Sequence, residues 1–208
     1  MIFRISSSED SFIDKIYSES VADLNKFYEL NWVHHLPKIL IVPDRKTFDE
    51  LNNEKTEPWN VGWAEGRTIY VLDKNSFETE SSHKYSDSYY SKLIKHEFSH
   101  LFYNNLAKGS YKPKWLSEGT AVFTSGQNYG KDKPAMFSKF LQFFDKNGKD
   151  NYKESGFAVQ CLIEKYGKEK LLELIKNLSS AKSEQEFYGL FEKIYGIKLS
   201  YDNFNKIL

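Results

Sequence analysis

The chain has 208 residues, of which 40% are hydrophobic, 16% aromatic and 28% charged. The aromatic content is too high for a disordered chain, and the charged content is too high for a membrane-embedded protein. Its 29 basic and 29 acidic side chains balance. A basic surplus is what nucleic-acid and anionic-membrane binding require, so neither kind of partner is expected. Composition gives no indication of the oligomeric state.

One cysteine, Cys161, excludes an intrachain disulfide. It lies in an apolar run, and we expect a small buried hydrophobic side chain rather than a reactive thiol. The N-terminus shows no basic segment followed by an apolar run of signal-peptide length. No stretch approaches the ~18 apolar residues of a membrane span. These features predict a soluble, cytoplasmic protein, although a cleaved leader would leave the same sequence.

The first third of the chain mixes helical and extended patterns. Helical spacing of apolar residues predicts a helix over residues 8–30, with Ser8 as its cap. Short β-branched runs predict buried strands at residues 38–42 and 68–72. Residues 47–53 are expected to form a brief helix. The polar stretch of residues 76–88 is expected to be a loop.

From about residue 88 onward the pattern becomes helical, with glycine and proline between the segments. Helices are predicted at residues 89–106, 115–127, 135–144, 152–166, 168–178 and 184–195. The predicted class is α+β in a single domain. A small sheet lobe with one long helix covers about residues 1–108, and a mostly helical lobe covers about residues 109–208.

Residues 96–100, His-Glu-Phe-Ser-His, carry the clearest chemical signal. His96 and His100 are four residues apart, so on a helix they share one face and can bind one metal ion. Glu97 adjoins the first histidine, and its carboxylate can reach a metal-bound water. This is the HExxH zinc motif. The alternative is a pair of helical histidines that hold no metal.

A zinc hydrolase usually needs a third protein ligand. The next acid along the chain is Glu118, which shares a helical face with Trp115 and Val122. A carboxylate on an apolar face is costly unless it is paired or binds a cation. We therefore predict Glu118 as the third ligand, the alternative being an ion pair with Lys114. The competing acids lie in polar surroundings, where solvent suffices: Asp132, Asp145, Asp150 and Glu154.

The motif, followed by Trp-Leu-Ser-Glu-Gly-Thr-Ala at residues 115–121, resembles the gluzincin peptidases, in particular the small peptidase MA-like domains. The similarity continues at residues 152–167 and 191–197. It therefore covers the chain from about residue 60 to the end, whereas residues 1–55 show no specific match.

This resemblance implies a zincin-like fold and a zinc metallopeptidase that acts on a peptide or protein. It implies that His96, His100 and Glu118 bind Zn2+ and that Glu97 is the general base. Family members also use a tyrosine to stabilise the oxyanion. The stretch beginning at Tyr152 is similar to that Tyr-x-x-Gly segment, with the glycine one residue later. A core or capping tyrosine is the alternative.

Two weaker oxyanion donors are Tyr129 and His83, which are otherwise expected to be exposed loop residues. Residues 62–66 lie where gluzincins place an edge strand that can pair with an extended peptide. Glu65 could bind a substrate amine there, and a surface glutamate in a turn is the alternative. His34 and His35 are expected to be structural, because adjacent histidines point to different faces.

One departure from the family concerns the position four residues after the glutamate ligand. Relatives often carry an acid there, which accepts a hydrogen bond from a ligand histidine; here it is Val122. Thr120, Thr124 or a backbone carbonyl could replace it. The departure favours a second hypothesis, a catalytically weak or inactive zincin scaffold that serves as a protein-binding module. A third hypothesis is a zinc hydrolase acting on a non-peptide amide.

Overall fold

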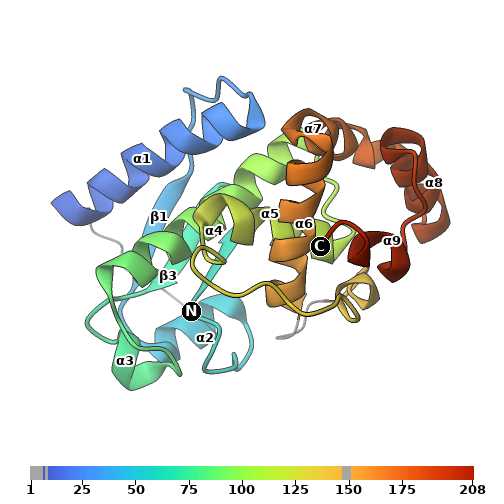
Figure 1. The fold of residues 1–208 in the computed structure, drawn as a ribbon. Helices are drawn as coiled ribbons and strands as arrows, with labels where there is room; N and C mark the ends of the chain where they lie inside the picture. Colours follow the sequence, from blue (N-terminus) through green and yellow to red (C-terminus); the bar gives the residue numbers. More distant parts are fainter. Residues whose placement is uncertain (1–6, 8, 147–150) are drawn as a thin grey trace.

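The computed structural model describes residues 7, 9–146 and 151–208 (Figure 1). Its fold is α+β, with one small sheet and a mostly helical remainder. The elements in chain order are α1 (Ser11–Tyr28), β1 (Lys38–Val42), α2 (Arg45–Asn52), β2 (Gly62–Glu65), β3 (Thr68–Leu72), α3 (Phe77–Glu80), α4 (Asp87–Leu106), α5 (Lys114–Ser125), η1 (Phe140–Gln142), α6 (Asn151–Tyr166), α7 (Lys168–Asn177), η2 (Leu178–Ser180), α8 (Glu184–Tyr195) and α9 (Tyr201–Asn205). Within the described ranges, no helix has both the length and the apolar character needed to cross a bilayer.

The three strands are arranged in the order β1-β3-β2. β1 runs parallel to β3, which requires a crossover connection, and α2 lies within it. β2 runs antiparallel to β3 and pairs Gly62 with Val71. Strands form at residues 38–42 and 68–72, as predicted. β1 is less buried than expected, because only Val42 among its residues is buried. β2 lies at one edge of this sheet, as the resemblance implied for residues 62–66.

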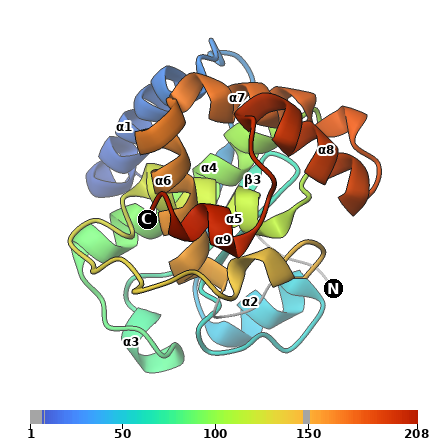
Figure 2. The same cartoon turned by 45° about the vertical axis from the view of Figure 1, so that its right-hand side comes forward.

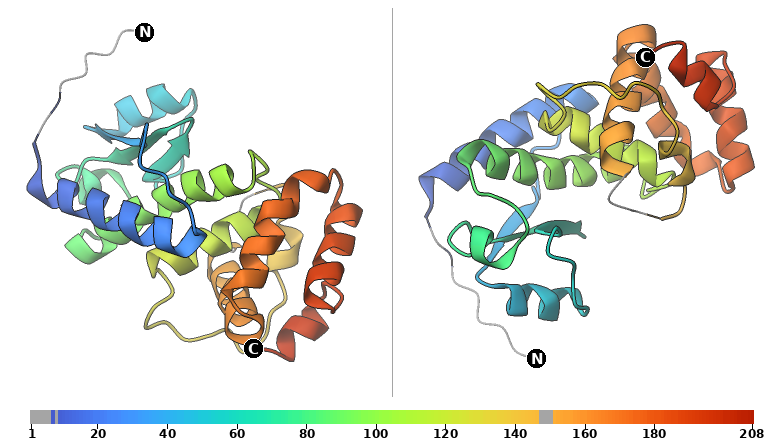
Figure 3. Two further views of the ribbon diagram at one scale, coloured as in Figure 1. Left: turned by 90° about the horizontal axis from the view of Figure 1, so that it is seen from above. Right: turned by 60° about the horizontal axis from the view of Figure 1, so that its bottom comes forward.

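Helix α4 is central to the fold. It packs against α1, α5, β2 and β3, and Figures 1 and 3 show α4 and α5 between the sheet and helices α6–α9. Four consecutive residues of α4, residues 96–99, are all buried. Neighbours therefore surround the helix, and the polar side chains of the motif are enclosed rather than solvated.

Helices α5 and α6 pack unusually closely. A Cβ atom placed on Gly119 of α5 would lie 2.3 Å from the carbonyl oxygen of Ser155. One placed on Gly156 of α6 would lie 2.4 Å from Cγ1 of Val122. Because only hydrogen fits at these two positions, the N-terminal turn of α6 can lie beside the middle of α5. The remaining helices α7–α9 group with α6 on that side of the molecule (Figure 2).

The helix predicted for residues 135–144 is wrong, since only the short helix η1 forms there. The carboxylate of Glu154 explains this. It accepts backbone hydrogen bonds of 2.7–3.1 Å from Ser138, Lys139 and Phe140. These amide hydrogens therefore satisfy a distant side chain instead of a helix ladder. The prediction that Glu154 lies in polar, solvated surroundings is also wrong, because it is buried.

The same segment completes the start of α5. The first amides of a helix lack intrahelical partners. Here the N–H groups of Lys114 and Trp115 donate to the carbonyl oxygens of Phe144 and Phe143, each at 2.9 Å. Residues 137–144 thus connect the beginning of α5 to the beginning of α6.

Several helix boundaries differ from the predictions. The predicted cap Ser8 lies outside the described residues, and α1 begins after Asp10, whose carboxylate accepts from the amides of Phe12 and Ile13. The segment expected to be a loop, residues 76–88, contains α3 and the first turn of α4. Helix α5 ends at Ser125, two residues early. Cys161 is buried, as expected. The division into two lobes near residue 108 stays a prediction.

Candidate metal centre

Three potential ligand atoms converge where α4 meets α5. Nε2 of His96 lies 3.1 Å from Nε2 of His100. Oε2 of Glu118 lies 3.3 Å from the first of these nitrogens and 3.4 Å from the second. The three atoms form a nearly equilateral triangle, so the structure brings together the three side chains predicted as ligands.

The dimensions of this triangle fit zinc. Zinc binds imidazole nitrogen at ~2.0–2.1 Å and carboxylate oxygen at ~2.0–2.2 Å, usually with tetrahedral geometry. Bonds of that length place neighbouring donors about 3.3–3.4 Å apart. The observed separations of 3.1, 3.3 and 3.4 Å agree with this value. Two histidines and one glutamate are also a donor set of catalytic zinc sites, which keep a fourth position for water or substrate.

The outer nitrogen of each histidine has its own partner. Nδ1 of His96 lies 2.9 Å from Oε1 of Gln127, and Nδ1 of His100 lies 3.2 Å from Oγ of Ser117. An amide oxygen only accepts, so Nδ1 of His96 carries the hydrogen and donates it. Its Nε2 lone pair then points toward Glu118. Partners of this kind fix the tautomer and the orientation of metal-binding histidines.

Gln127 is thus the hydrogen-bond partner of His96, and Val122, at the position where an acid was considered for that purpose, is not. The expectation that Thr120 or Thr124 would substitute is wrong, because both hydroxyls donate to backbone carbonyls of α5. Gln127 lies just after α5, where the chain turns at Gly126 with a φ of 72°. Val122 instead packs against Gly156 and belongs to the close contact between α5 and α6.

Glu118 is only 4% exposed. Burial alone would raise the pKa of Glu118. In the metal-free site the two imidazoles can be protonated, and positive charge on His100 and His96 then outweighs burial and holds the pKa of Glu118 below its ordinary value. The alternative ion pair with Lys114 is not formed. The Lys114 ammonium lies over the ring of Tyr111, 4.7 Å from its centroid. Glu118 therefore faces the two histidines as an anion.

Glu97 is 6% exposed and lies beneath the edge strand. A Cβ atom on Gly62 of β2 would lie 3.4 Å from Cγ of Glu97. Burial, together with the charge of Glu118, raises the pKa of Glu97 to about 7, while His96 opposes the shift. A carboxylate with a pKa near neutrality is suited to accept and return a proton.

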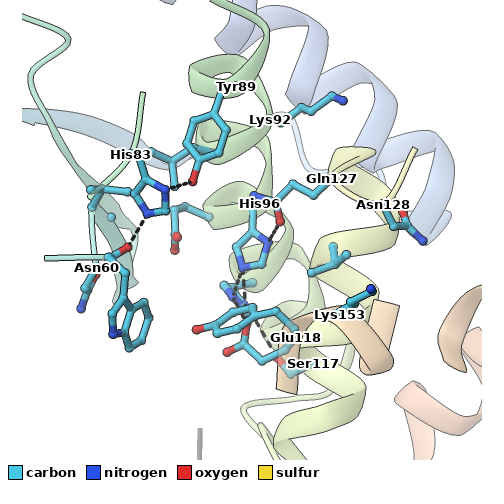
Figure 4. Close-up of a pocket in the computed structure, with 18 of the residues that line it drawn as sticks. Asn60, His83, Tyr89, Lys92, His96, Ser117, Glu118, Gln127, Asn128 and Lys153 are labelled. Carbon is cyan, nitrogen blue, oxygen red and sulfur yellow. Dashed lines mark hydrogen bonds and ion pairs between the residues drawn. The ribbon is translucent and has the colours of Figure 1, made fainter. Parts of the chain in front are cut away.

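Glu97, the three predicted ligands and the histidine partners Gln127 and Ser117 line one cleft of about 1150 Å³ (Figure 4). Its walls come from residues 59–64, α4, α5, the segment after α5 and the beginning of α6. Tyr152 lies in the cleft, with its ring centroid 6.1 Å from that of His96 and 6.2 Å from that of Trp59. Burial raises the pKa of Tyr152, with Glu118 and Glu97 adding to it, so the phenol stays protonated and can donate a hydrogen bond.

His83 and Tyr129 also line the cleft. Tyr129 is 88% exposed, as expected. The expectation of an exposed His83 is wrong, because the side chain is partly buried and held at both nitrogens. Nε2 bonds to the carbonyl oxygen of Trp59 at 2.9 Å, and Nδ1 to the hydroxyl of Tyr89 at 3.0 Å. A carbonyl only accepts, so the ring's N–H is already used. Figure 4 shows His83 and Tyr89 on one side of His96 and Gln127 on the other.

Most of the other residues considered as ligands or substrate contacts lie outside the cleft. Glu65 is exposed at the end of β2 and is not part of the cleft lining. His34 and His35 are exposed after α1. Among the competing acids, Asp145 pairs with Lys112, Asp132 lines the cleft and Asp150 falls outside the described residues.

Gln127 and Ser117 are not among the site residues predicted from the sequence. Ser117 directly precedes a predicted ligand, and a hydroxyl at that position is a local signal for a histidine partner. Nothing local marks Gln127, which reaches His96 across 31 positions of the chain.

Comparison with known proteins returns no match: neither a protein-family model nor a curated protein matches the chain. What indicates a metal centre is therefore the site itself. It consists of three donor atoms at tetrahedral spacing, two oriented histidines and a buried carboxylate beside them.

Proposed function

We propose that the protein is a zinc-dependent metallopeptidase of gluzincin type with a zincin-like fold. The spacing of the donor atoms of His96, His100 and Glu118, which would hold the ion, carries the proposal. The resemblance of residues 96–121 to gluzincins supports it. So does the position of Glu97, which is buried next to a ligand histidine and lines the same cleft.

A zinc ion at this site would lower the pKa of a water toward ~7 and polarise a carbonyl group. Glu97 would accept a proton from the attacking water and deliver it to the leaving amine. Tyr152 would donate its hydroxyl hydrogen toward the negative charge that develops on the carbonyl oxygen. The hydrogen bonds that His96 makes with Gln127 and His100 makes with Ser117 would keep both ligand histidines oriented.

The edge strand supports a peptide as the substrate. β2 pairs with β3 along one side only, and residues 61–64 line the cleft. An extended peptide could add to the free side of β2 through backbone hydrogen bonds. Because Gly62 lies directly against Glu97, a peptide bound there would pass close to the proposed base.

The competing hypothesis is a zincin scaffold that binds a protein partner without cleaving it. That hypothesis was favoured by Val122, which stands where gluzincins often carry an acid. Gln127 makes the hydrogen bond to His96 that such an acid would make. A purely structural zinc site has no use for a buried carboxylate beside its ligand. We therefore favour the peptidase.

The test combines metal content with catalysis. Wild type should bind about one zinc per chain and cleave members of a peptide library. Glu97→Gln should retain zinc and lose at least ~100-fold in kcat/KM, the range of a general base. Glu65→Gln, which removes an exposed carboxylate outside the cleft lining, is the matched control and should retain activity.

Three results would contradict the proposal. Wild type that holds no zinc after incubation with the metal and dialysis would remove the metal centre. Full activity of Glu97→Gln would remove Glu97 as the base. Zinc binding without any cleavage by wild type would favour the binding-module hypothesis.

A further inference from the structure

Three lysines from three different elements line one part of the cleft. Lys92 lies on α4 one turn before His96, Lys131 follows α5, and Lys153 lies on α6 next to Tyr152. Figure 4 shows Lys92 and Lys153 on the same side of His96 as Gln127, away from His83. We refer to Lys92, Lys131 and Lys153 as the lysine cluster.

The cluster is a local excess of positive charge in a chain whose charges balance. The pKa of Lys131 is lowered, because part of the side chain is shielded from water and because Lys92 and Lys153 carry positive charges nearby. Within residues 7, 9–146 and 151–208, no carboxylate forms an ion pair with any of the three. Two acids adjoin the cluster along the chain. Asp132, next to Lys131, lines the same cleft, whereas Glu154, next to Lys153, accepts from the backbone amides of residues 138–140.

The fourth lysine of the cleft, Lys114, does not belong to this group. Its ammonium lies over the ring of Tyr111, 4.7 Å from the centroid. Lys114 starts α5, whereas the cluster surrounds the segment that follows the end of α5. Three of the four lysines that line the cleft therefore lie in one part of it.

We propose that the lysine cluster binds a carboxylate of the peptide substrate and makes negatively charged peptides the preferred class. An anion would relieve the mutual repulsion of the three ammonium groups that line this part of the cleft. This inference rests on the proposed function, because it assigns specificity to the same cleft. The carboxylate belongs either to an aspartate or glutamate side chain or to the free C-terminus of the peptide.

The geometry also limits where that carboxylate lies. Lys92 precedes His96 by four residues of helix, which corresponds to a rise of about 6 Å. An extended peptide advances ~3.3 Å per residue. The negative group is therefore expected within about three residues of the cleaved bond, on the side that faces Gln127.

The experiment compares matched peptides. Each pair differs only by Glu against Gln at one position near the cut, or by a free against an amidated C-terminus. Their kcat/KM ratios are measured with wild type and with the triple variant Lys92→Gln, Lys131→Gln, Lys153→Gln. The control triple variant, Lys182→Gln, Lys193→Gln, Lys198→Gln, removes three exposed charges outside the cleft lining. In parallel, fluorescence anisotropy measures binding of the same peptides to zinc-loaded Glu97→Gln.

Wild type and the control should prefer one charged peptide at least ten-fold, and the cluster variant should reduce that ratio to near one. A preference for an internal glutamate assigns the site to a side chain. A preference only for the free C-terminus assigns it to the terminal carboxylate and predicts cleavage near the end of the chain. If the triple variant misfolds, as judged by its melting temperature and zinc content, Lys131→Gln alone should still lower the ratio several-fold.

Different results would contradict the role of the lysine cluster and the peptidase activity. Cleavage without charge preference, or a preference that survives in the cluster variant, would overturn the role of the lysines and leave the peptidase intact. Charge-dependent binding with no cleavage by wild type would overturn the peptidase and retain the carboxylate site. Absence of both binding and cleavage would reject both.

Discussion

Helices α4 and α5 and the segment of residues 126–146 both face the candidate metal centre, yet they are held in place differently. Both helices form close to the residues predicted for them, and Ser86 caps α4 by accepting from the amide of Tyr89. The segment forms only the short helix η1, and its backbone bonds to Glu154 and to the start of α5. The helix pair supplies the three donor side chains, whereas the segment supplies Gln127. The donor side chains of the candidate metal centre thus come from helices that the local sequence indicates, whereas their surroundings depend on contacts between distant residues.

Loss of a ligand from the helix pair should have the largest effect. Glu118→Ala removes one of three donor atoms and leaves two histidines. We expect the zinc affinity to fall by more than about 100-fold, which is the upper limit for losing an outer partner of a ligand. Competition with a chromophoric chelator measures this directly.

Two further variants make this result specific. Glu118→Gln keeps the shape of the side chain but removes its charge, and it should also weaken zinc binding strongly. His35→Ala removes an exposed histidine far along the chain from the motif and should leave the affinity unchanged. Tight, stoichiometric zinc in Glu118→Ala would show that another residue is the third ligand.

The sequence predicted what depends on local pattern. The strands at residues 38–42 and 68–72 and the helix at residues 184–195 form as expected. The strands are short β-branched runs and the helix has apolar residues at helical spacing, so local pattern indicates each of them. The three donor side chains could be predicted for the same reason. Two of them share one helical face, and the third is an acid on an apolar face.

The remaining features depend on contacts between distant residues. Residues 135–144 have the composition of a helix, yet the carboxylate of Glu154 binds their amide groups. His83 is half-buried because two distant oxygens hold its ring. Gln127 reaches His96 only because the chain turns back after α5. None of these pairings has a fixed spacing that one sequence could reveal.

The contact between α5 and α6 offers a second test, on stability rather than metal binding. Gly119→Ala places a Cβ atom 2.3 Å from a backbone carbonyl oxygen, so α6 must shift. The better helix propensity of alanine offsets only ~1 kcal/mol. Overpacking of a close contact costs up to about 3 kcal/mol, so we expect a net loss of about 2 kcal/mol in the free energy of unfolding. For a chain of this size that corresponds to a fall of about 4–8 °C in melting temperature.

A second glycine provides the matched control. Gly189 lies within α8, and a Cβ atom there would meet nothing within 4 Å. Gly189→Ala should therefore stabilise the protein by about 0.5–1 kcal/mol through helix propensity alone. Equal melting temperatures for the two variants would mean that the fold does not require the close contact between α5 and α6. The position of Tyr152 in the cleft would then not depend on that contact.

The smallest effect is expected in the segment after α5. Gln127→Ala removes the acceptor for Nδ1 of His96 but keeps all three donor atoms. Partners of ligand histidines contribute 10–100-fold to metal affinity. A neutral amide polarises the ring less than a carboxylate, so we expect a loss of about ten-fold.

Gln127→Glu tests the physical reason for that loss. A carboxylate at the same position should raise the basicity of His96 and bind zinc at least as tightly as wild type. Tyr129→Ala, two residues later and 88% exposed, should leave the affinity unchanged. If Gln127→Ala lowers the zinc affinity as strongly as Glu118→Ala, the segment after α5 is as important for zinc binding as the two helices. In that case the segment after α5 would have to be counted as part of the metal centre.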